Sequence, residues 1–231
     1  MEKWRGKIAV ITGASSGIGE SLAKTLASNG LIVIALARRV EIVEAIAKTS
    51  KGVIHAHKCD VSDLNSIKET FKWIEEKFSS ISILINNAGK STQAKVLDPS
   101  DDATDKLNSV IETNFTGLVH FTRLGVRLIK KSQDYGLVIN IGSVLDSIIP
   151  SQSYSIYPAT KFAVRAFSEV IRYELTAEKN EKIRVTTLSP GYTKTNIVVA
   201  SGAKDDTKKN KNNPYMLPGD ISESVIYIMS T

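Results

Sequence analysis

The sequence predicts a single α/β domain built on a doubly wound parallel sheet, and three features of its 231 residues predict it. Short apolar runs rich in β-branched residues alternate with helical patterns along almost the whole chain, which is typical of βαβ units. The apolar runs are continuous, as expected for strands that helices cover on both faces. No repeat or Pro/Gly-rich linker divides the chain, so one domain over residues 1–231 is the simplest organisation.

The strands and helices follow one another in order along the chain. Six strands are expected at residues 7–12, 31–35, 53–57, 81–85, 136–141 and 183–188. Helical patterns begin near Ile18, Glu41, Asp63, Ala103 and Tyr154. A last helix is expected at 221–229, after a turn signal at Pro218 and Gly219.

Composition excludes several classes of protein. The chain is 42% hydrophobic with a mean hydropathy of -0.07, and no segment approaches the roughly 18 consecutive apolar residues of a membrane span. The first residues carry no signal-peptide pattern, and a single cysteine, Cys59, agrees with a reducing compartment. We therefore expect a cytoplasmic protein without a membrane span.

The net charge of +6 could attract nucleic acid. The densest basic run, residues 204–211, contains Asp205 and Asp206 and no aromatic residue for base stacking. A solvated loop is the expected structure, and no nucleic-acid partner is expected.

A glycine turn after the first predicted strand leads directly into a helix. Glycines allow tight turning there, and the free N–H groups at a helix N-terminus attract a pyrophosphate. A βα turn also needs glycine for steric reasons alone, but the position of this one favours dinucleotide binding in a Rossmann-type fold. The cofactor-binding candidates in the turn are Gly13, Ser15, Ser16, Gly17, Ile18 and Gly19.

The end of the second predicted strand indicates which cofactor is bound. An acidic residue at this place binds the ribose hydroxyls of NAD, whereas arginine accommodates the 2′-phosphate of NADP. Arg38 and Arg39 stand here, and no carboxylate occurs before Glu41. The sequence predicts NADP(H) in preference to NAD(H), the alternative being that both arginines are solvated residues that open a helix.

Taken together, ordered motifs from Thr12 to Thr195 resemble the short-chain dehydrogenase/reductase family. The resemblance implies an adenine contact by Asp60 and Val61, a cofactor-side motif at Asn87, Ala88 and Gly89, and a nicotinamide loop with Pro190, Gly191, Thr193 and Thr195. It also implies a catalytic set of Asn114, Ser143, Tyr157 and Lys161, with Tyr157 and Lys161 contacting the cofactor as well.

Within this family, three stretches are most similar to insect farnesol dehydrogenases and related animal dehydrogenase/reductases. They are residues 4–7, 37–39 and 85–89. The resemblance implies oxidation of an isoprenoid alcohol such as farnesol with NADP, or reduction of carbonyls or ketosteroids.

Tyr157 and Lys161 have the spacing that a proton relay needs. Residues four apart share a helix face, and a nearby ammonium lowers the pKa of a phenol from about 10 by favouring phenolate. Ser143 can donate to the substrate oxygen, and by resemblance Asn114 binds a water that links Lys161 to solvent. An isolated Tyr-x-x-x-Lys would more simply be a half-buried tyrosine beside a surface lysine.

Two further segments suggest partners. The residues from Asn196 to Pro218, apolar at both ends, resemble a substrate-binding lid that favours a hydrophobic substrate. An apolar stripe after Lys161 is core or, by resemblance, the face of a homodimer or homotetramer. His55 and His57 lack a third ligand, so no metal site is expected.

The pattern departs from the family after the last helix. The family adds a seventh strand there, and no strand pattern follows Met229. Either the sequence is truncated at this point, or the protein does without this strand and exposes the sheet edge that it would cover. Reduced stability, aggregation or inactivity are then expected. The alternative function is therefore a catalytically weak or inactive dinucleotide-binding protein with a regulatory or structural role.

Overall fold

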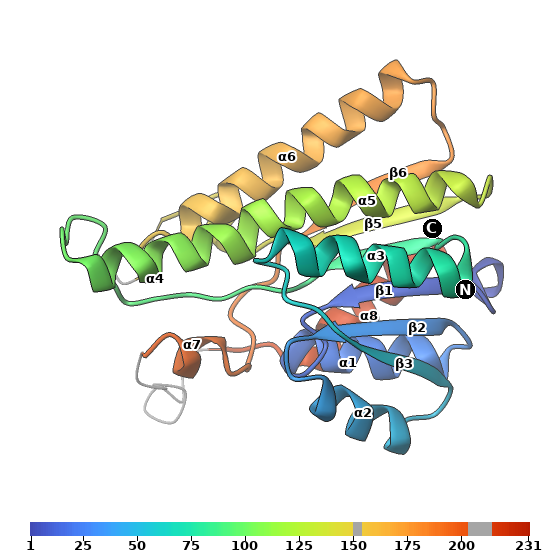
Figure 1. The fold of residues 1–231 in the computed structure, drawn as a ribbon, viewed down its shortest axis with the longest axis horizontal. Helices are drawn as coiled ribbons and strands as arrows, with labels where there is room; N and C mark the ends of the chain where they lie inside the picture. The colour runs from blue at the N-terminus through green and yellow to red at the C-terminus, as the bar shows by residue number, and fades with distance from the viewer. Residues whose placement is uncertain (150–153, 203–213) are drawn as a thin grey trace.

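The computed structural model describes residues 1–149, 154–202 and 214–231. Six parallel strands form one sheet in the order β3-β2-β1-β4-β5-β6. Figure 1 shows β2 and β3 on one side of β1, and β5 and β6 on the other. The predicted doubly wound α/β domain is confirmed. The strands are β1 (Ile8–Thr12), β2 (Ile32–Ala37), β3 (Val53–Lys58), β4 (Ile83–Asn86), β5 (Gly136–Ile141) and β6 (Ile183–Leu188).

Helices cover both faces of this sheet because neighbouring strand residues point to opposite sides. In β1, Ala9 and Ile11 belong to one buried cluster, with α1, α2 and α8, whereas Val10 belongs to the other, with α3, α5 and α6. The main helices are α1 (Gly17–Ser28), α2 (Val40–Thr49), α3 (Leu64–Phe78), α4 (Asp101–Ile111), α5 (Gly117–Lys131), α6 (Tyr157–Ala177) and α8 (Pro218–Ser230).

Three helical predictions differ from the structure. The last helix, α8, begins at Pro218 and not at residue 221, so the predicted turn residues Pro218 and Gly219 form its first turn. The pattern that begins near Ala103 is two helices, α4 and α5, joined by a five-residue π-helical segment, η2 (Glu112–Thr116). The last long helix before β6 begins at Tyr157 and not near Tyr154. Pro158 explains this start, since its missing N–H and fixed φ suit the first turn of a helix.

The two ends of the described chain lie close together beside β1 (Figure 1). The indole Nε1 of Trp4 donates to the main-chain oxygen of Met229 at 2.8 Å, and α8 packs on α1. Arg184 on the edge strand β6 donates to the main-chain oxygen of Ile228 at 2.9 Å. The last helix is thereby joined to both the start of the chain and the edge of the sheet.

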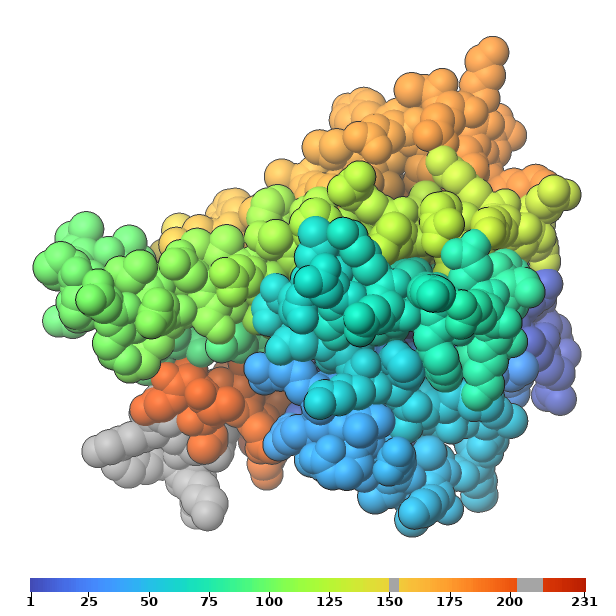
Figure 2. All heavy atoms as spheres, in the orientation of Figure 1, coloured from blue at the N-terminus to red at the C-terminus, as the bar shows by residue number. Residues whose placement is uncertain are grey.

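The space-filling view shows where the molecule extends beyond its sheet (Figure 2). α4 and the loop before it project at one end, and the C-terminal part of α6 projects at the other. No helix within the described residues has the length and hydropathy needed to span a membrane. The basic run 204–211 lies outside the described residues.

Candidate active site

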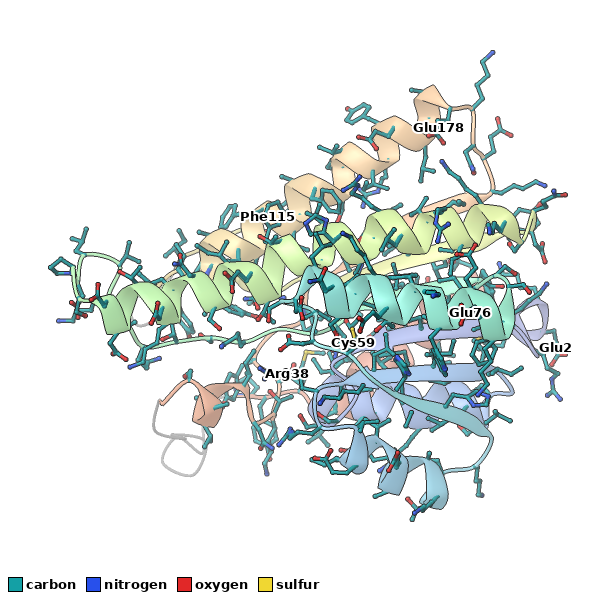
Figure 3. All side chains as sticks on the ribbon, viewed as in Figure 1. Glu2, Arg38, Cys59, Glu76, Phe115 and Glu178 are labelled. Carbon is teal, nitrogen blue, oxygen red and sulfur yellow. The ribbon has the colours of Figure 1, made fainter. Side chains whose placement is uncertain are left out.

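The predicted site residues follow all six strands and so meet at one edge of the sheet, because the carboxyl ends of parallel strands share an edge. Arg38 and Cys59 lie at this end of β2 and β3 in the side-chain view (Figure 3). The glycine turn follows β1, Asn87 follows β4, and Ser143 follows β5.

The glycine turn adopts a backbone that glycine permits. Gly13 and Gly17 have φ of 69° and 58°, in the left-handed region that other residues avoid. A Cβ on Gly19 would lie 2.3 Å from the main-chain oxygen of Gly13 and 2.5 Å from Asn87 Nδ2. The turn can therefore close against the start of α1 only when residue 19 has no side chain.

Asn87 and Ala88 join the β4 end to this turn through Thr12. Both main-chain N–H groups donate to Thr12 Oγ1 at 3.0 Å, and Asn87 Nδ2 donates to the main-chain oxygen of Thr12 at 2.9 Å. The sequence reasoning did not include Thr12 among the site residues. Its position as the residue before the first glycine was the available signal.

The start of α1 fits a pyrophosphate. Ser16 is the N-cap but makes no capping hydrogen bond with its side chain, so first-turn N–H groups remain available to an anion. A cleft of about 400 Å³ opens there. It is lined by Gly17, Glu20, Ser21, Lys24, Lys194, Thr195, Asn196 and Pro218.

Two arginines flank the adenosine side of this turn. Arg38 and Arg39 are both exposed, and Arg39 Nη2 donates to Ser15 Oγ at 3.3 Å. Asp60 lies nearby and its Oδ1 accepts from the main-chain N–H and the hydroxyl of Ser62. Burial alone would raise the pKa of Asp60, but the Ser62 hydrogen bonds and the charges of Arg38 and Lys90 outweigh it and lower that pKa.

Val61 and Gly89 complete the predicted cofactor contacts at this edge. The main-chain oxygen of Val61 would lie 2.0 Å from a Cβ on Gly117. The first residue of α5 is therefore packed directly against the loop that follows β3. A Cβ on Gly89 would meet Asn114 Oδ1 at 3.5 Å and Lys161 Nζ at 3.9 Å. Gly89 thus lies between the predicted cofactor-side motif and the predicted catalytic set.

Ser143, Tyr157 and Lys161 come together where α6 begins, next to the end of β5. Ser143 is the N-cap of η3 (Val144–Asp146) and hydrogen bonds with the Tyr157 phenol. Lys161 is buried, donates through Nζ to the main-chain oxygen of Ile141 at 2.7 Å and lies 5.6 Å from the centre of the Tyr157 ring. The helical spacing predicted from the sequence therefore brings phenol and ammonium onto one face.

Burial controls the proton affinities of this pair. Burial raises the pKa of Tyr157 to about 12, and the charge of Asp146 acts in the same direction. The hydrogen bond with Ser143 acts in the opposite direction and lowers this pKa. Burial lowers the pKa of Lys161 to about 8, against Asp146, which raises it. The sequence predicted that Lys161 lowers the pKa of Tyr157, and the structure does not show this. Desolvation disfavours the charged forms of both Tyr157 and Lys161.

Asn114 is held rigidly in the π-helical segment. Its Nδ2 donates to the main-chain oxygen of Lys90 at 2.9 Å and to Thr160 Oγ1 at 3.0 Å, and its Oδ1 accepts from the Lys90 N–H at 2.8 Å. Sequence reasoning missed both partners. Thr160 stands directly before Lys161 in the chain, which was the available signal.

The loop after β6 returns to the glycine turn. A Cβ on Gly17 would lie 3.1 Å from Thr195 Cγ2, and Thr193 Oγ1 donates to the main-chain oxygen of Gly191 at 3.0 Å. Pro190 is buried and accepts from the Val144 N–H. Met216 pairs with Thr193 in a parallel bridge, which brings the far end of the predicted lid to this loop, while its residues 203–213 lie outside the described part.

The two histidines of β3 contact aromatic rings. His57 stacks on Trp73 with ring centres 4.1 Å apart, and His55 meets Phe78 edge to face. Across residues 1–149, 154–202 and 214–231, no three His, Cys, Asp or Glu side chains gather as a metal ion would require.

Comparisons with known proteins agree with this geometry. The family model described as short chain dehydrogenase matches residues 7–206. Farnesol dehydrogenase of Aedes aegypti is 39% identical over all of this chain and 93% of its own length. Dehydrogenase/reductase SDR family member 11 of Homo sapiens is 34% identical over all of this chain and 91% of its own length.

Solved structures show the same fold. A serine dehydrogenase complexed with NADP+ has a TM-score of 0.85 and 29% identity, over 97% of this chain and 89% of that one. A 3-ketoacyl-(acyl-carrier-protein) reductase from Brucella melitensis complexed with NADH has a TM-score of 0.83 and 25% identity, over 97% of this chain and 91% of that one.

The fold, the glycine turn and the comparisons together identify the protein as a dinucleotide-binding oxidoreductase that uses NAD(P). More particularly, the chain belongs to the short-chain dehydrogenase/reductase family.

Proposed function

We propose that this protein transfers a hydride between NADP(H) and a hydrophobic alcohol or carbonyl compound, such as farnesol, a related isoprenoid or a steroid. The observation that carries the proposal is the cluster of Ser143, Tyr157 and Lys161 at the start of α6. The similarity to farnesol dehydrogenase supports the substrate class.

The preference for NADP(H) rests on Arg38 and Arg39. Both guanidinium groups follow β2, and Arg39 already contacts Ser15 of the turn. Guanidinium groups give a phosphate charge-assisted, bidentate hydrogen bonds. The neighbouring Asp60 accepts hydrogen bonds from Ser62, and the charge of Arg38 lowers its pKa. The two arginines are then the charged groups that face the adenosine part of the cofactor in this proposal.

The protein's residues handle the proton of the reaction. When bound, the nicotinamide accepts or supplies the hydride, and its oxidised form adds a positive charge. Tyr157 Oη takes the alcohol proton, or gives it to the carbonyl oxygen in the reverse direction. Ser143 Oγ donates to the same substrate oxygen and orients it. The positive charge of the oxidised nicotinamide favours the Tyr157 phenolate. Asn114 holds the water that connects Lys161 to solvent.

In this proposal the described parts of the predicted lid, residues 196–202 and 214–218, contact the substrate. The described part is apolar at both ends, with Ile197, Val198 and Val199 on one side and Tyr215 and Leu217 on the other. Val199, Tyr215 and Leu217 are about half exposed. Such side chains suit contact with a lipophilic alcohol.

The experiment compares Tyr157→Phe with Tyr154→Phe in NADPH titration and in turnover of farnesol and ketone panels. Tyr154 stands in front of α6 and is 39% exposed, so its phenol serves as the matched control. We expect Tyr157→Phe to bind NADPH normally and to lose at least about 100-fold in turnover. Normal NADPH binding without turnover in the unaltered protein would support the catalytically inactive alternative.

A further inference from the structure

A buried carboxylate lies beneath the catalytic set. Asp146 is 2% exposed and ends η3, three residues after Ser143. Its main-chain N–H donates to the main-chain oxygen of Ser143 at 2.8 Å. The proton relay assigned above does not use this side chain, and its burial keeps it from touching substrate.

The surroundings of Asp146 are built to hold a carboxylate. Ser189 Oγ donates to Oδ2, Ser147 Oγ donates to Oδ1 at 2.7 Å, and Arg165 Nη1 lies 3.9 Å from Oδ1. A Cβ on Gly142 would lie 2.8 Å from Oδ2, so the residue that follows β5 makes room for the carboxylate because it is a glycine. Buried carboxylates are stable when hydroxyl donors and a cation satisfy them in this way.

The charge of Asp146 acts on both members of the relay. It raises the pKa of Tyr157 and that of Lys161, since a negative charge disfavours phenolate and favours ammonium. Arg165, on the same helix as Tyr157 and Lys161, faces Asp146 as its counter-charge and also donates to Ser147 Oγ at 2.7 Å. Lys90, whose main chain contacts Asn114, donates through Nζ to Ser109 Oγ on α4.

We propose that Asp146 is a positioning residue that keeps Lys161 charged and Tyr157 protonated, with Arg165 moderating its field. The inference rests on the proposed function in that Tyr157 and Lys161 are taken as the proton relay. Asp146 would then set the pH at which the relay begins to work as a base.

Two substitutions change the charge in opposite directions. Asp146→Asn keeps the shape and removes the negative charge, whereas Arg165→Gln removes the exposed cation. The first should lower the pH at which Lys161 titrates, and the second should raise it. We expect shifts of about half a pH unit for Asp146→Asn and a smaller shift of opposite sign for Arg165→Gln.

The direct measurement is NMR of the lysine side chains in isotope-labelled full-length protein across pH, with Lys161→Met to assign the signal. The second measurement is the pH profile of alcohol oxidation. Its rise should move to lower pH in Asp146→Asn and to higher pH in Arg165→Gln, because oxidation needs the Tyr157 phenolate.

A merely structural role predicts a different result. Lower turnover with an unmoved Lys161 midpoint, or shifts of the same sign in both variants, would overturn the proposal. If Asp146→Asn does not fold, Arg165→Gln alone decides, because its side chain lies largely in solvent. Absence of turnover in the unaltered protein would contradict the proposed function, while the NMR midpoints would still test Asp146.

Discussion

Gly19 shows how one missing side chain sets the cofactor turn. Its Cα approaches the Gly13 oxygen so closely that Gly19→Ala forces a main-chain shift. We expect this change to lower the free energy of unfolding by about 1–3 kcal/mol and to weaken NADPH binding. Denaturant unfolding and NADPH fluorescence titration measure both effects.

Gly219→Ala is the control for this prediction. Gly219 lies in the first turn of α8, and a Cβ there meets nothing within 4 Å. Because alanine favours helix, stability should be unchanged or slightly higher. An equal loss in both variants would contradict the steric explanation.

Arg38 is the residue on which the cofactor preference can be tested. Arg38→Asp removes a phosphate donor and adds a ribose-binding carboxylate, so NADPH affinity should fall about 10- to 100-fold while NADH affinity is kept. Parallel fluorescence titrations with both cofactors measure the change. Arg123→Asp, an exposed site on α5, makes the same charge change as a control, and equal loss of both cofactors in Arg38→Asp would remove the phosphate argument.

At the scale of elements, a π-helical segment positions Asn114, the asparagine that we predict at the active site. Residues 112–116 interrupt the path from α4 to α5, and Asn114 points from there to Lys90 and Thr160. Such segments occur often at functional sites because the wider turn redirects side chains. The sequence contains Thr113, Asn114 and Phe115 at this point, which are weak helix formers, but nothing in the pattern distinguishes a π segment from a continuous helix.

The edge strand β3 makes stability sensitive to mild acid. Burial and the charge of Lys77 lower the pKa of His55 and His57 below 6.5. The unfolded chain then binds more protons than the folded protein below about pH 6.5, so stability falls as pH drops through this range. Urea unfolding at pH 7.5 and 5.5 should show this loss.

The paired variant His55→Gln/His57→Gln tests the origin of this pH dependence. Glutamine cannot take up a proton, so the difference between the two pH values should shrink. His120→Gln, on α5, serves as the control substitution. An undiminished difference in the paired variant would assign the pH dependence to other groups.

For the molecule as a whole, helix α6 presents an apolar surface beside its buried side. Ile171 packs in the core, whereas Phe162, Val170 and Tyr173 are 40%, 49% and 76% exposed. The predicted apolar stripe therefore splits into a core part and an exposed part. This exposed part keeps open the expectation of a homodimer or homotetramer, since contiguous exposed apolar residues mark association surfaces.

Light scattering after size-exclusion chromatography tests the assembly. We expect the mass of a dimer or tetramer, and a lower mass for Val170→Lys, because a charge in such a surface costs desolvation energy. Tyr227→Lys on α8, where the tyrosine is 72% exposed, should leave the mass unchanged. A monomer in the unaltered protein would contradict the expectation.

The prediction of strands and helices succeeded where the pattern is local. The sequence-based limits of β5 and β6 match the structure, and the other strands differ by two residues or fewer at each end. Apolar, β-branched runs carry that information because each lies between helices that cover both faces. The predicted start of α6 near Tyr154 was wrong although Pro158 is a local signal for the observed start at Tyr157. The break between α4 and α5 has no such local signal, because Asn114 in η2 has its partners, Lys90 and Thr160, on other segments.

The sequence by itself determined the order of the elements, the glycine turn and the spacing of Tyr157 and Lys161, since each depends on neighbours in the chain. Only the tertiary structure placed Thr12, Thr160 and Asp146 at the site, because their partners come from distant strands and helices. It also decided the direction of the Tyr157 pKa. Spacing indicates which charge lies nearby, whereas desolvation depends on how many other segments bury the phenol.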